Sequence, residues 1–182
     1  MSARVSPESD RSQFLAAAAM STYREVLTAM ETAGADYAWI GLSAASVHGA
    51  TLVSFDFDFF VRPQVEHLDR VRQALSQIGL TDSQAGIHSA NLIAAGATTP
   101  YFDPYGGPLV DLLTEISGPS FDDVWRDSVL REFQGLRVRV ASLRHIVASK
   151  LAANREKDRA AIDRLRLDFP DLVNEVEQRR QK

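Results

Sequence analysis

The apolar residues of the chain repeat with two periods, one typical of helices and one typical of strands. A period near 3.6 residues predicts amphipathic helices, whereas alternation or a short unbroken apolar run predicts strands. The helices expected are 12–33, 44–48, 65–78, 120–128, 142–155, 158–167 and a last short helix after Pro170. The strands expected are 37–40, 54–61, 88–95, 109–114 and the two arms of a hairpin over 129–140. Two prolines and two glycines make 98–107 a loop.

This order of elements predicts an α/β (α+β) fold in which helices flank a mixed β-sheet. The 182 residues are enough for one domain with a substantial core. We expect residues 1–11 to be a flexible N-terminus and residues 12–141 to form the core. Residues 142–182 then form a C-terminal helical extension that packs on this core in one globular unit.

Two aspartates one residue apart, Asp56 and Asp58, stand in the run SFDFDFFV. A period of two places both on one strand face together with Ser54, and phenylalanines on the other. Two carboxylates on an otherwise apolar strand repel each other and resist burial, and a divalent cation is the simplest compensation. The alternative is an edge strand with a solvated face, but the aromatic residues favour a strand held deep in the fold. We therefore predict a metal site here.

A third carboxylate, Asp111, stands in the apolar run LVDLLT. A lone carboxylate between apolar neighbours is costly unless it is paired. If strands 54–61 and 109–114 are neighbours, Asp111 completes a three-carboxylate cluster. Such a cluster can hold two Mg²⁺ ions about 4 Å apart and serve in-line nucleotidyl transfer. A salt bridge from Asp111 to a basic side chain is the alternative.

Two positions near strand 37–40 suit a phosphate. Gly41 follows this strand, and Ser43 stands at the N-cap position of the short helix expected after it. The free N–H groups at a helix start bind anions. An ordinary strand–turn–helix corner explains the same pattern, so both interpretations stay open.

The helix that Ser142 is expected to cap carries a lysine in its apolar stripe. Lys150 lies seven residues after Leu143, and Asp158 follows on the same predicted face. A lysine that faces inward needs an anion, which the carboxylate cluster or a nucleotide phosphate would supply. The alternative is a packed stem with its ammonium in water. Arg155, Lys157 and Asp163 either extend this polar end or are surface charges.

Composition and charge narrow the classes of protein further. The net charge is −4, but residues 137–182 carry +5 and the remainder −9, so the C-terminal part could meet an anion or nucleic acid. A solvated helix surface is the plainer explanation of this charge. The chain has no cysteine, which excludes thiolate metal sites and fits a reducing, cytoplasmic location. We expect no signal peptide and no membrane span, and neither a G-x-S-x-G nor a P-loop motif is present.

The glycine turn, the D-x-D strand, the isolated strand aspartate and the tail KLAANREKDRAAIDRL together resemble the nucleotidyltransferase-like superfamily, which has the DNA polymerase β-like fold. The likeness spans about residues 37–165 and is nearest to the AbiEii/MenT-type branch, many members of which are toxins of toxin–antitoxin pairs. It implies a nucleotidyltransferase that uses Mg²⁺ (or Mn²⁺) to move an NMP from an NTP to a hydroxyl acceptor. RNA, for example a tRNA 3′ end, is one acceptor that the likeness implies, and a cognate antitoxin protein is an implied partner.

The resemblance also assigns roles to single residues. The metal ligands would be Asp56, Asp58 and Asp111, of which Asp111 helps to deprotonate the attacking hydroxyl. The nucleotide would be contacted by Gly41, Ser43, Ser54, Lys150, Asp158 and Asp163, with Lys150 also catalytic. Leu42 and Leu52 depart from the family pattern, which usually has a small residue after the glycine and an arginine before the D-x-D strand. These departures keep open a non-catalytic nucleotidyltransferase-like binding module or a partner protein.

Overall fold

The computed structural model describes residues 23–52, 54, 56–102 and 110–180. Its strands are β1 (Tyr37–Ile40), β2 (Phe57–Val61), β3 (Thr81–Asp82), β4 (Thr98–Phe102), β5 (Val110–Leu113), β6 (Val129–Phe133) and β7 (Leu136–Val140). Residues 23–32 are helical. The helices that follow are α2 (Gly41–Val47), α3 (Val65–Gln77), α4 (Ser89–Ala94), α5 (Phe121–Asp127), α6 (Leu143–Ala153), α7 (Glu156–Asp168) and α8 (Pro170–Arg180).

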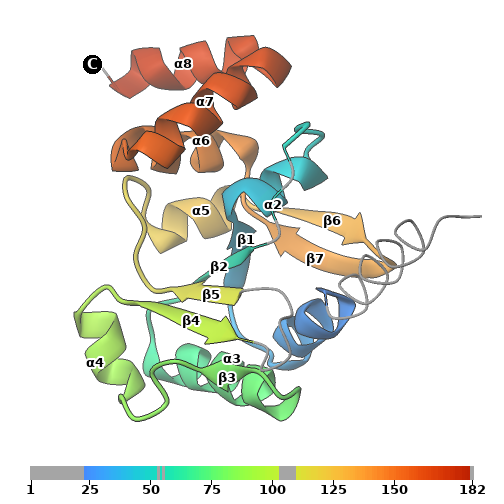
Figure 1. The fold of residues 1–182 in the computed structure, drawn as a ribbon, viewed down its shortest axis with the longest axis vertical. Helices are drawn as coiled ribbons and strands as arrows, with labels where there is room; N and C mark the ends of the chain where they lie inside the picture. The colour runs from blue at the N-terminus through green and yellow to red at the C-terminus, as the bar shows by residue number, and fades with distance from the viewer. Residues whose placement is uncertain (1–22, 53, 55, 103–109, 181–182) are drawn as a thin grey trace, which may run out of the picture.

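The described strands form one mixed sheet of seven strands in the order β3-β4-β5-β2-β1-β7-β6. At its centre, β2 pairs antiparallel with β1 and parallel with β5. The pairing of β1 with β7 is also parallel, whereas the outer pairs are antiparallel. Helices flank this sheet, as Figure 1 shows. The predicted α/β (α+β) architecture is therefore confirmed, and so is the expected contact between the two strands that carry aspartates.

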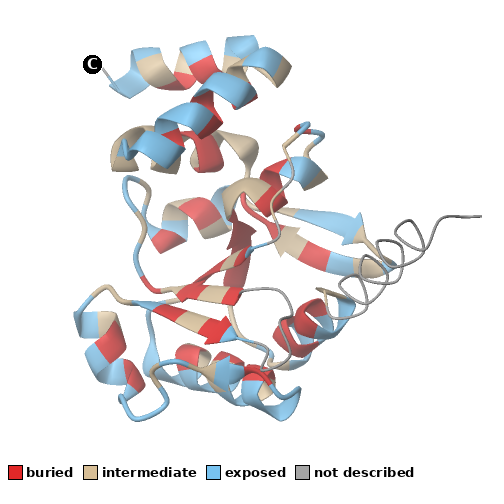
Figure 2. Ribbon diagram, viewed as in Figure 1, coloured by how far each residue is buried: buried red, intermediate tan, exposed pale blue. Residues whose placement is uncertain are grey.

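Aromatic side chains fix the central strand β2 in the core. The rings of Phe57 and Phe59 stack 5.7 Å apart, and Trp39 on β1 stacks 4.8 Å from Phe57. On the other face of β2, Phe60 meets the edge of Phe121 on α5 at 5.2 Å. Trp39 on β1 and the three phenylalanines on β2 are all buried, and Figure 2 shows buried residues along these central strands. Burying side chains of this size supplies much of the apolar driving force.

The C-terminal helices lie together at one end of the sheet (Figure 1). The Ser142 hydroxyl caps α6 by accepting a hydrogen bond from the His145 N–H, as its N-cap position predicts. Asn154 ends α6 in the left-handed conformation, with φ of +50°. The chain then turns back into α7, and α6 packs against α2, α7 and α8. Among the described helices, none has the length and apolar character that crossing a bilayer requires.

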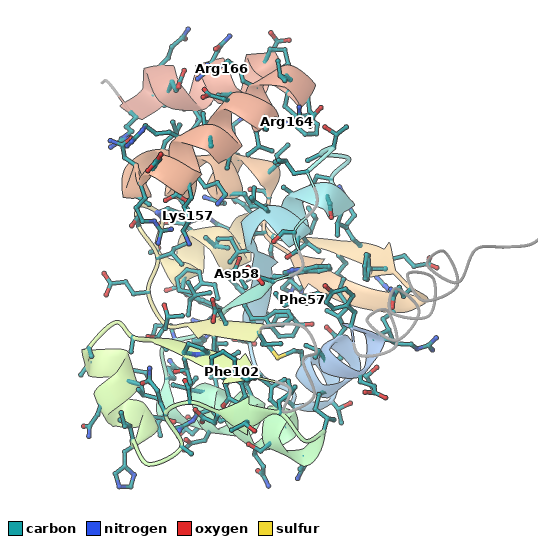
Figure 3. All side chains as sticks on the ribbon, in the orientation of Figure 1. Phe57, Asp58, Phe102, Lys157, Arg164 and Arg166 are labelled. Carbon is teal, nitrogen blue, oxygen red and sulfur yellow. The ribbon has the colours of Figure 1, made fainter. Side chains whose placement is uncertain are left out.

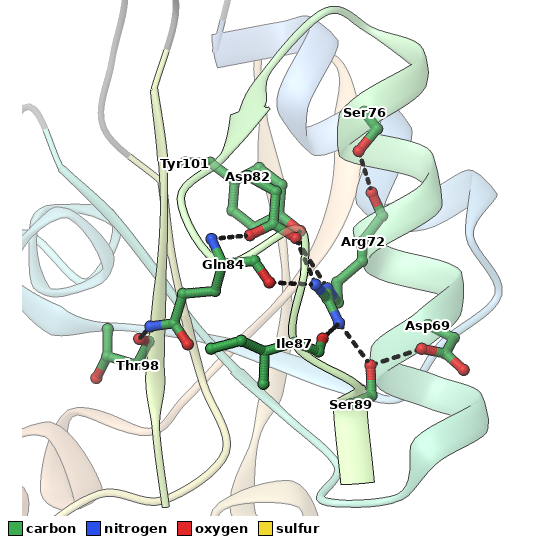
Figure 4. Close-up of polar contacts among 9 residues, drawn as sticks. All are labelled: Asp69, Arg72, Ser76, Asp82, Gln84, Ile87, Ser89, Thr98 and Tyr101. Carbon is green, nitrogen blue, oxygen red and sulfur yellow. Dashed lines mark hydrogen bonds and ion pairs between the residues drawn. The ribbon is translucent and has the colours of Figure 1, made fainter. Parts of the chain in front are cut away.

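A half-buried arginine ties α3 to the two outer strands β3 and β4 (Figure 4). Arg72 forms an ion pair with Asp82 at 2.9 Å, and Tyr101 on β4 donates its hydroxyl to the same carboxylate at 3.0 Å. The Gln84 side-chain amide donates to the Thr98 carbonyl at 2.9 Å. These contacts hold β4 in the sheet beside β5.

Two predictions in this region are wrong. The expected strand 88–95 is the helix α4, because its alanines and its single pair of apolar neighbours suit a short helix. The expected loop 98–107 begins with strand β4, whose pairing with β5 and β3 outweighs the strand-breaking effect of Pro100. The rest of that loop, from residue 103, lies outside the described residues, as do residues 1–22 of the expected N-terminus and first helix.

Candidate functional site

Two aspartates are direct neighbours at the centre of the sheet. The register of the parallel pair β2–β5 sets Asp58 opposite Asp111. Neighbouring strands lie about 4.8 Å apart, and residues in register project from the same face. The fold therefore holds two carboxylates side by side, although like charges in such a position repel each other. This adjacency is what the sequence predicts from the two apolar runs.

The surroundings of this pair disfavour its ionised form. Burial raises the pKa of Asp58 to about 6, and Asp111 and Asp56 add to the rise. Lys150 and Lys157 act in the opposite direction on the pKa of Asp58. The pKa of Asp111 is also raised, first by burial and then by Asp56, while Lys157 lowers it. A cation placed between the carboxylates would lower the pKa of both Asp58 and Asp111.

The other aspartate of the D-x-D run, Asp56, precedes strand β2. β2 begins at Phe57, so the predicted strand 54–61 is shorter at its start, and residues 53 and 55 lie outside the described part of the chain. Asp56 is exposed, and its N–H donates to the Ser54 hydroxyl at 3.4 Å. Asp56 and Ser54 both line the same cavity as Asp58. Asp56 thus reaches the site from the position just before β2, and not as part of the strand.

A cavity of about 360 Å³ is lined by these three carboxylates, by Asp158 and by three cationic side chains. The sheet side contributes the three carboxylates, and the corner between α6 and α7 contributes Asp158 and the cations Lys150, Arg155 and Lys157. Figure 3 shows Asp58 on the sheet and Lys157 at the helical end of the molecule. The apolar part of the lining is Ile40, Leu42, Leu113, Ile116, Ile146 and Ala153. Facing groups of opposite charge with an apolar part beside them suit a phosphorylated organic ligand.

Gly41 makes the close approach of α2 to Asp58 possible. Its φ is +83°, a conformation that other residues rarely adopt. A Cβ added to Gly41 would collide with the Asp58 carboxylate. Gly41 also lines the cavity, together with the aspartates.

Ser43 lies elsewhere. The helix α2 begins at Gly41 and not at Ala44, so Ile40 occupies the N-cap position and Ser43 is inside the helix. The Ser43 hydroxyl accepts a hydrogen bond from the Trp39 indole at 2.9 Å, and the residue is buried. The prediction of Ser43 as an N-cap is wrong, and its hydroxyl supports the core.

Lys150 and Asp158 do meet, but across a corner between two helices. The Lys150 ammonium lies 3.4 Å from the Asp158 carboxylate, and the Lys150 side chain is 16% exposed. The prediction that both lie on one face of one helix is wrong, because α6 ends at Asn154 and Asp158 is in the first turn of α7. Burial alone would raise the pKa of Asp158, but Arg155 and Lys150 hold it below its usual value.

The remaining assignments divide into two groups. Asp163 is exposed on α7 and is not among the residues that line the cavity, so the structure does not bring it together with the other predicted site residues. Arg155 and Lys157, for which the sequence leaves surface charge as an alternative, line the cavity. Thr98 lines it as well. Sequence reasoning misses Thr98 because it treats β4 as a loop.

The carboxylates suit a hard divalent cation in their chemistry, since Mg²⁺ and Mn²⁺ prefer oxygen ligands. Within the part of the chain that the structure describes, however, no three or more His, Asp or Glu side chains are arranged to hold a metal ion. The three aspartates thus share a cavity without forming a complete set of ligands. Phosphate oxygens of a nucleotide are the natural further ligands for Mg²⁺ in such sites.

The comparisons identify the fold. No protein-family model matches the sequence, and no curated protein matches it. A crystal structure of a Thermotoga maritima protein, whose own assignment as a nucleotidyltransferase is provisional, superposes with a TM-score of 0.53. The match covers 82% of this chain and 92% of that one, at 13% sequence identity. The chain therefore has a nucleotidyltransferase-like fold, and the likeness at this identity concerns the fold alone.

Proposed function

We propose that the protein is a nucleotidyltransferase that moves an NMP group from an NTP to a hydroxyl acceptor. The observation that carries the proposal is the in-register pair Asp58–Asp111, which shares one cavity with Lys150 and Lys157 in a fold of this class. Carboxylates and cations arranged in this way can hold the two opposite charges of a metal–triphosphate complex. The resemblance to the AbiEii/MenT-type branch supports the same proposal.

The carboxylate donors present suit a magnesium or manganese cofactor in their chemistry, although the described residues do not by themselves form a complete ligand set. Asp56, Asp58 and Asp111 would hold it, and the raised pKa values of Asp58 and Asp111 indicate a site that gains from a cation. When bound, Mg²⁺ (or Mn²⁺) would orient the triphosphate and offset the charge that develops at phosphorus.

The protein's own groups have separate tasks in this scheme. Lys150, Arg155 and Lys157 bind the triphosphate through charge-assisted hydrogen bonds. Asp111 accepts the proton of the acceptor hydroxyl. The hydroxyl oxygen then forms a bond to the α-phosphorus, and the bond from the α-phosphorus to the bridging oxygen breaks. Pyrophosphate leaves, and the acceptor carries the NMP.

RNA is the acceptor that we favour, with a tRNA 3′ end as one candidate. The C-terminal residues 137–182 carry a net charge of +5, and the exposed Arg159 and Arg164 continue along α7 from Lys157. Cationic side chains beside a site attract a phosphate backbone. The same resemblance suggests that the protein is the toxin of a toxin–antitoxin pair and binds a cognate antitoxin.

A transfer assay tests the function. The protein is incubated with Mg²⁺, total RNA and each NTP in turn, labelled on either the α- or the γ-phosphate. We expect label from the α-phosphate alone to enter RNA, and we expect Asp56→Ala to abolish it. Label from the γ-phosphate in RNA would indicate a different phosphoryl transfer and refute the proposal. Calorimetric binding of Mg²⁺ and NTP without product on RNA, protein or small hydroxyl acceptors would favour the non-catalytic binding module.

A further inference from the structure

Asp158 is buried between two cations of the cavity. The residue is 1% exposed. Its Oδ2 accepts a hydrogen bond from Arg155 Nε at 2.6 Å, and its Oδ1 accepts from Arg155 Nη2 at 3.3 Å. The same Oδ1 accepts from the Lys150 ammonium at 3.4 Å. Both oxygens of Asp158 therefore already have partners within the protein, and almost none of their surface is open to a ligand.

These contacts join two helices at the point where the cavity needs a fixed cation. Lys150 belongs to the last turn of α6, and Asp158 belongs to the first turn of α7, where a negative charge is favourable. A lysine side chain is a flexible stem with a compact charge at its end, so it needs a partner to occupy one position. Arg155 is 62% exposed at its side chain and grips Asp158 with two nitrogen atoms, which orients the carboxylate toward Lys150.

We propose that Asp158 is a positioning residue that holds the Lys150 ammonium in place for the triphosphate and does not itself contact the nucleotide. This inference rests on the proposed nucleotidyl transfer for its kinetic consequences. It changes the role that the sequence resemblance implies for Asp158, from a nucleotide contact to a support for the lysine that makes one. Arg155 in turn orients Asp158.

The substitution Asp158→Asn distinguishes a residue that positions Lys150 from one that contacts the nucleotide. Asparagine keeps the shape and one acceptor oxygen but removes the charge that anchors Lys150. Lys150 and Arg155 remain in the cavity and have lost a competing carboxylate, so the KM for NTP should stay the same or fall. The turnover number kcat should fall by about tenfold to a hundredfold, since misplacement of a reacting group by about 1 Å has effects of this size. A contact between Asp158 and the nucleotide would instead raise KM.

Two further variants serve as references. Asp163→Asn removes the same charge from an exposed position of the same helix, and we expect its kcat and KM to match the wild type within about twofold. In a Lys150→Ala background, adding Asp158→Asn should lower kcat by no more than about twofold, because the residue through which Asp158 acts is gone. Equal losses in both backgrounds would overturn the proposal.

Chemical labelling of lysines gives a measurement that needs no catalysis. Limiting acetic anhydride is added to the wild-type protein and to each variant, and acetylation at Lys150 is compared with Lys157 by mass spectrometry. We expect Asp158→Asn to raise the relative labelling of Lys150 at least threefold, because the ammonium loses the charge-assisted hydrogen bond that holds its proton and its position, whereas Asp163→Asn should leave the labelling unchanged. Arg155→Gln, a change at an exposed side chain, should raise it to a smaller extent and replaces Asp158→Asn if that variant does not fold.

The outcomes distinguish this inference from the proposed function. Unchanged labelling of Lys150 in folded Asp158→Asn or Arg155→Gln would refute the positioning role, whatever the enzyme does. Increased labelling without turnover by any form of the protein would refute the proposed function and leave the support of Lys150 by Asp158 confirmed. Increased labelling together with a fall in kcat at constant KM would support both.

Discussion

The substitution Asp58→Asn should make the protein more stable at neutral pH while it abolishes transferase activity. Burial and the neighbouring Asp111 raise the pKa of Asp58 from 3.8 to about 6. A difference of one in pKa corresponds to about 1.4 kcal/mol, so keeping Asp58 ionised in the folded protein costs about 3 kcal/mol at neutral pH. Asparagine avoids this cost but still buries a polar amide. We therefore expect a gain of about 1–3 kcal/mol in the free energy of unfolding.

The pH dependence of this gain follows from linkage. The folded protein binds more protons at Asp58 than the unfolded chain between the two pKa values, so wild-type stability falls as the pH rises through this window. The difference between Asp58→Asn and the wild type should thus be absent below the unfolded value of 3.8 and complete above about 6. Changes in other carboxylates affect both proteins and largely cancel in the difference.

Urea denaturation without divalent cations, at about pH 4 and about pH 7.5, measures this effect. Asp163→Asn is the matched control and should differ from the wild type by less than about 0.5 kcal/mol at both values. Added Mg²⁺ should stabilise the wild type and not Asp58→Asn, so the difference in their free energies of unfolding should become smaller. An Asp58→Asn protein that is no more stable than the wild type at neutral pH, or equally stabilised at both pH values, would refute the reasoning.

Three other predictions concern the site and its support. At subsaturating Mg²⁺, transfer activity should fall as the pH drops through about 6, because protonation of Asp58 competes with binding of the cation, and a pH–rate profile that stays flat down to pH 5 under these conditions would contradict this. Gly41→Ala should cost at least about 2 kcal/mol in urea denaturation and exceed Gly79→Ala, which has a similar φ of +88° but no atom within 4 Å of an added Cβ. Equal losses of stability in Gly41→Ala and Gly79→Ala would mean that the collision with Asp58 does not contribute to the cost. Arg72→Met should cost about 3–5 kcal/mol, since it leaves the buried Asp82 without its cation, and the double variant with Asp82→Asn should recover part of that loss.

The centre of the fold was predictable because two short, nearly continuous apolar runs determine it. The apolar runs around Asp58 and Asp111 each need burial on both sides, and only neighbouring strands in the middle of a sheet provide it. The hairpin over 129–140 was predictable from the pair Gln134–Gly135, both of which have positive φ in the turn.

The failures have a common cause, which is that tertiary contacts decide where elements begin and end. β4 is a strand because it pairs with β5 and is held by Gln84, and no local pattern reports those contacts. The sequence predicts two helices here, 142–155 and 158–167, but the helical pattern of KLAANREKD continues across Asn154 and does not show that the chain turns Asp158 back toward Lys150. Asparagine tolerates the left-handed conformation but does not require it. For the same reason the cationic side of the cavity was only partly predictable.

A crystal structure of the protein with Mg²⁺ and a non-hydrolysable NTP tests the central claim most directly. We predict that the triphosphate lies in the cavity, with its oxygens near Lys150 and Lys157 and a metal ion bound by Asp58 and Asp111. A nucleotide bound at another surface, or a metal ion bound without either aspartate, would contradict the account.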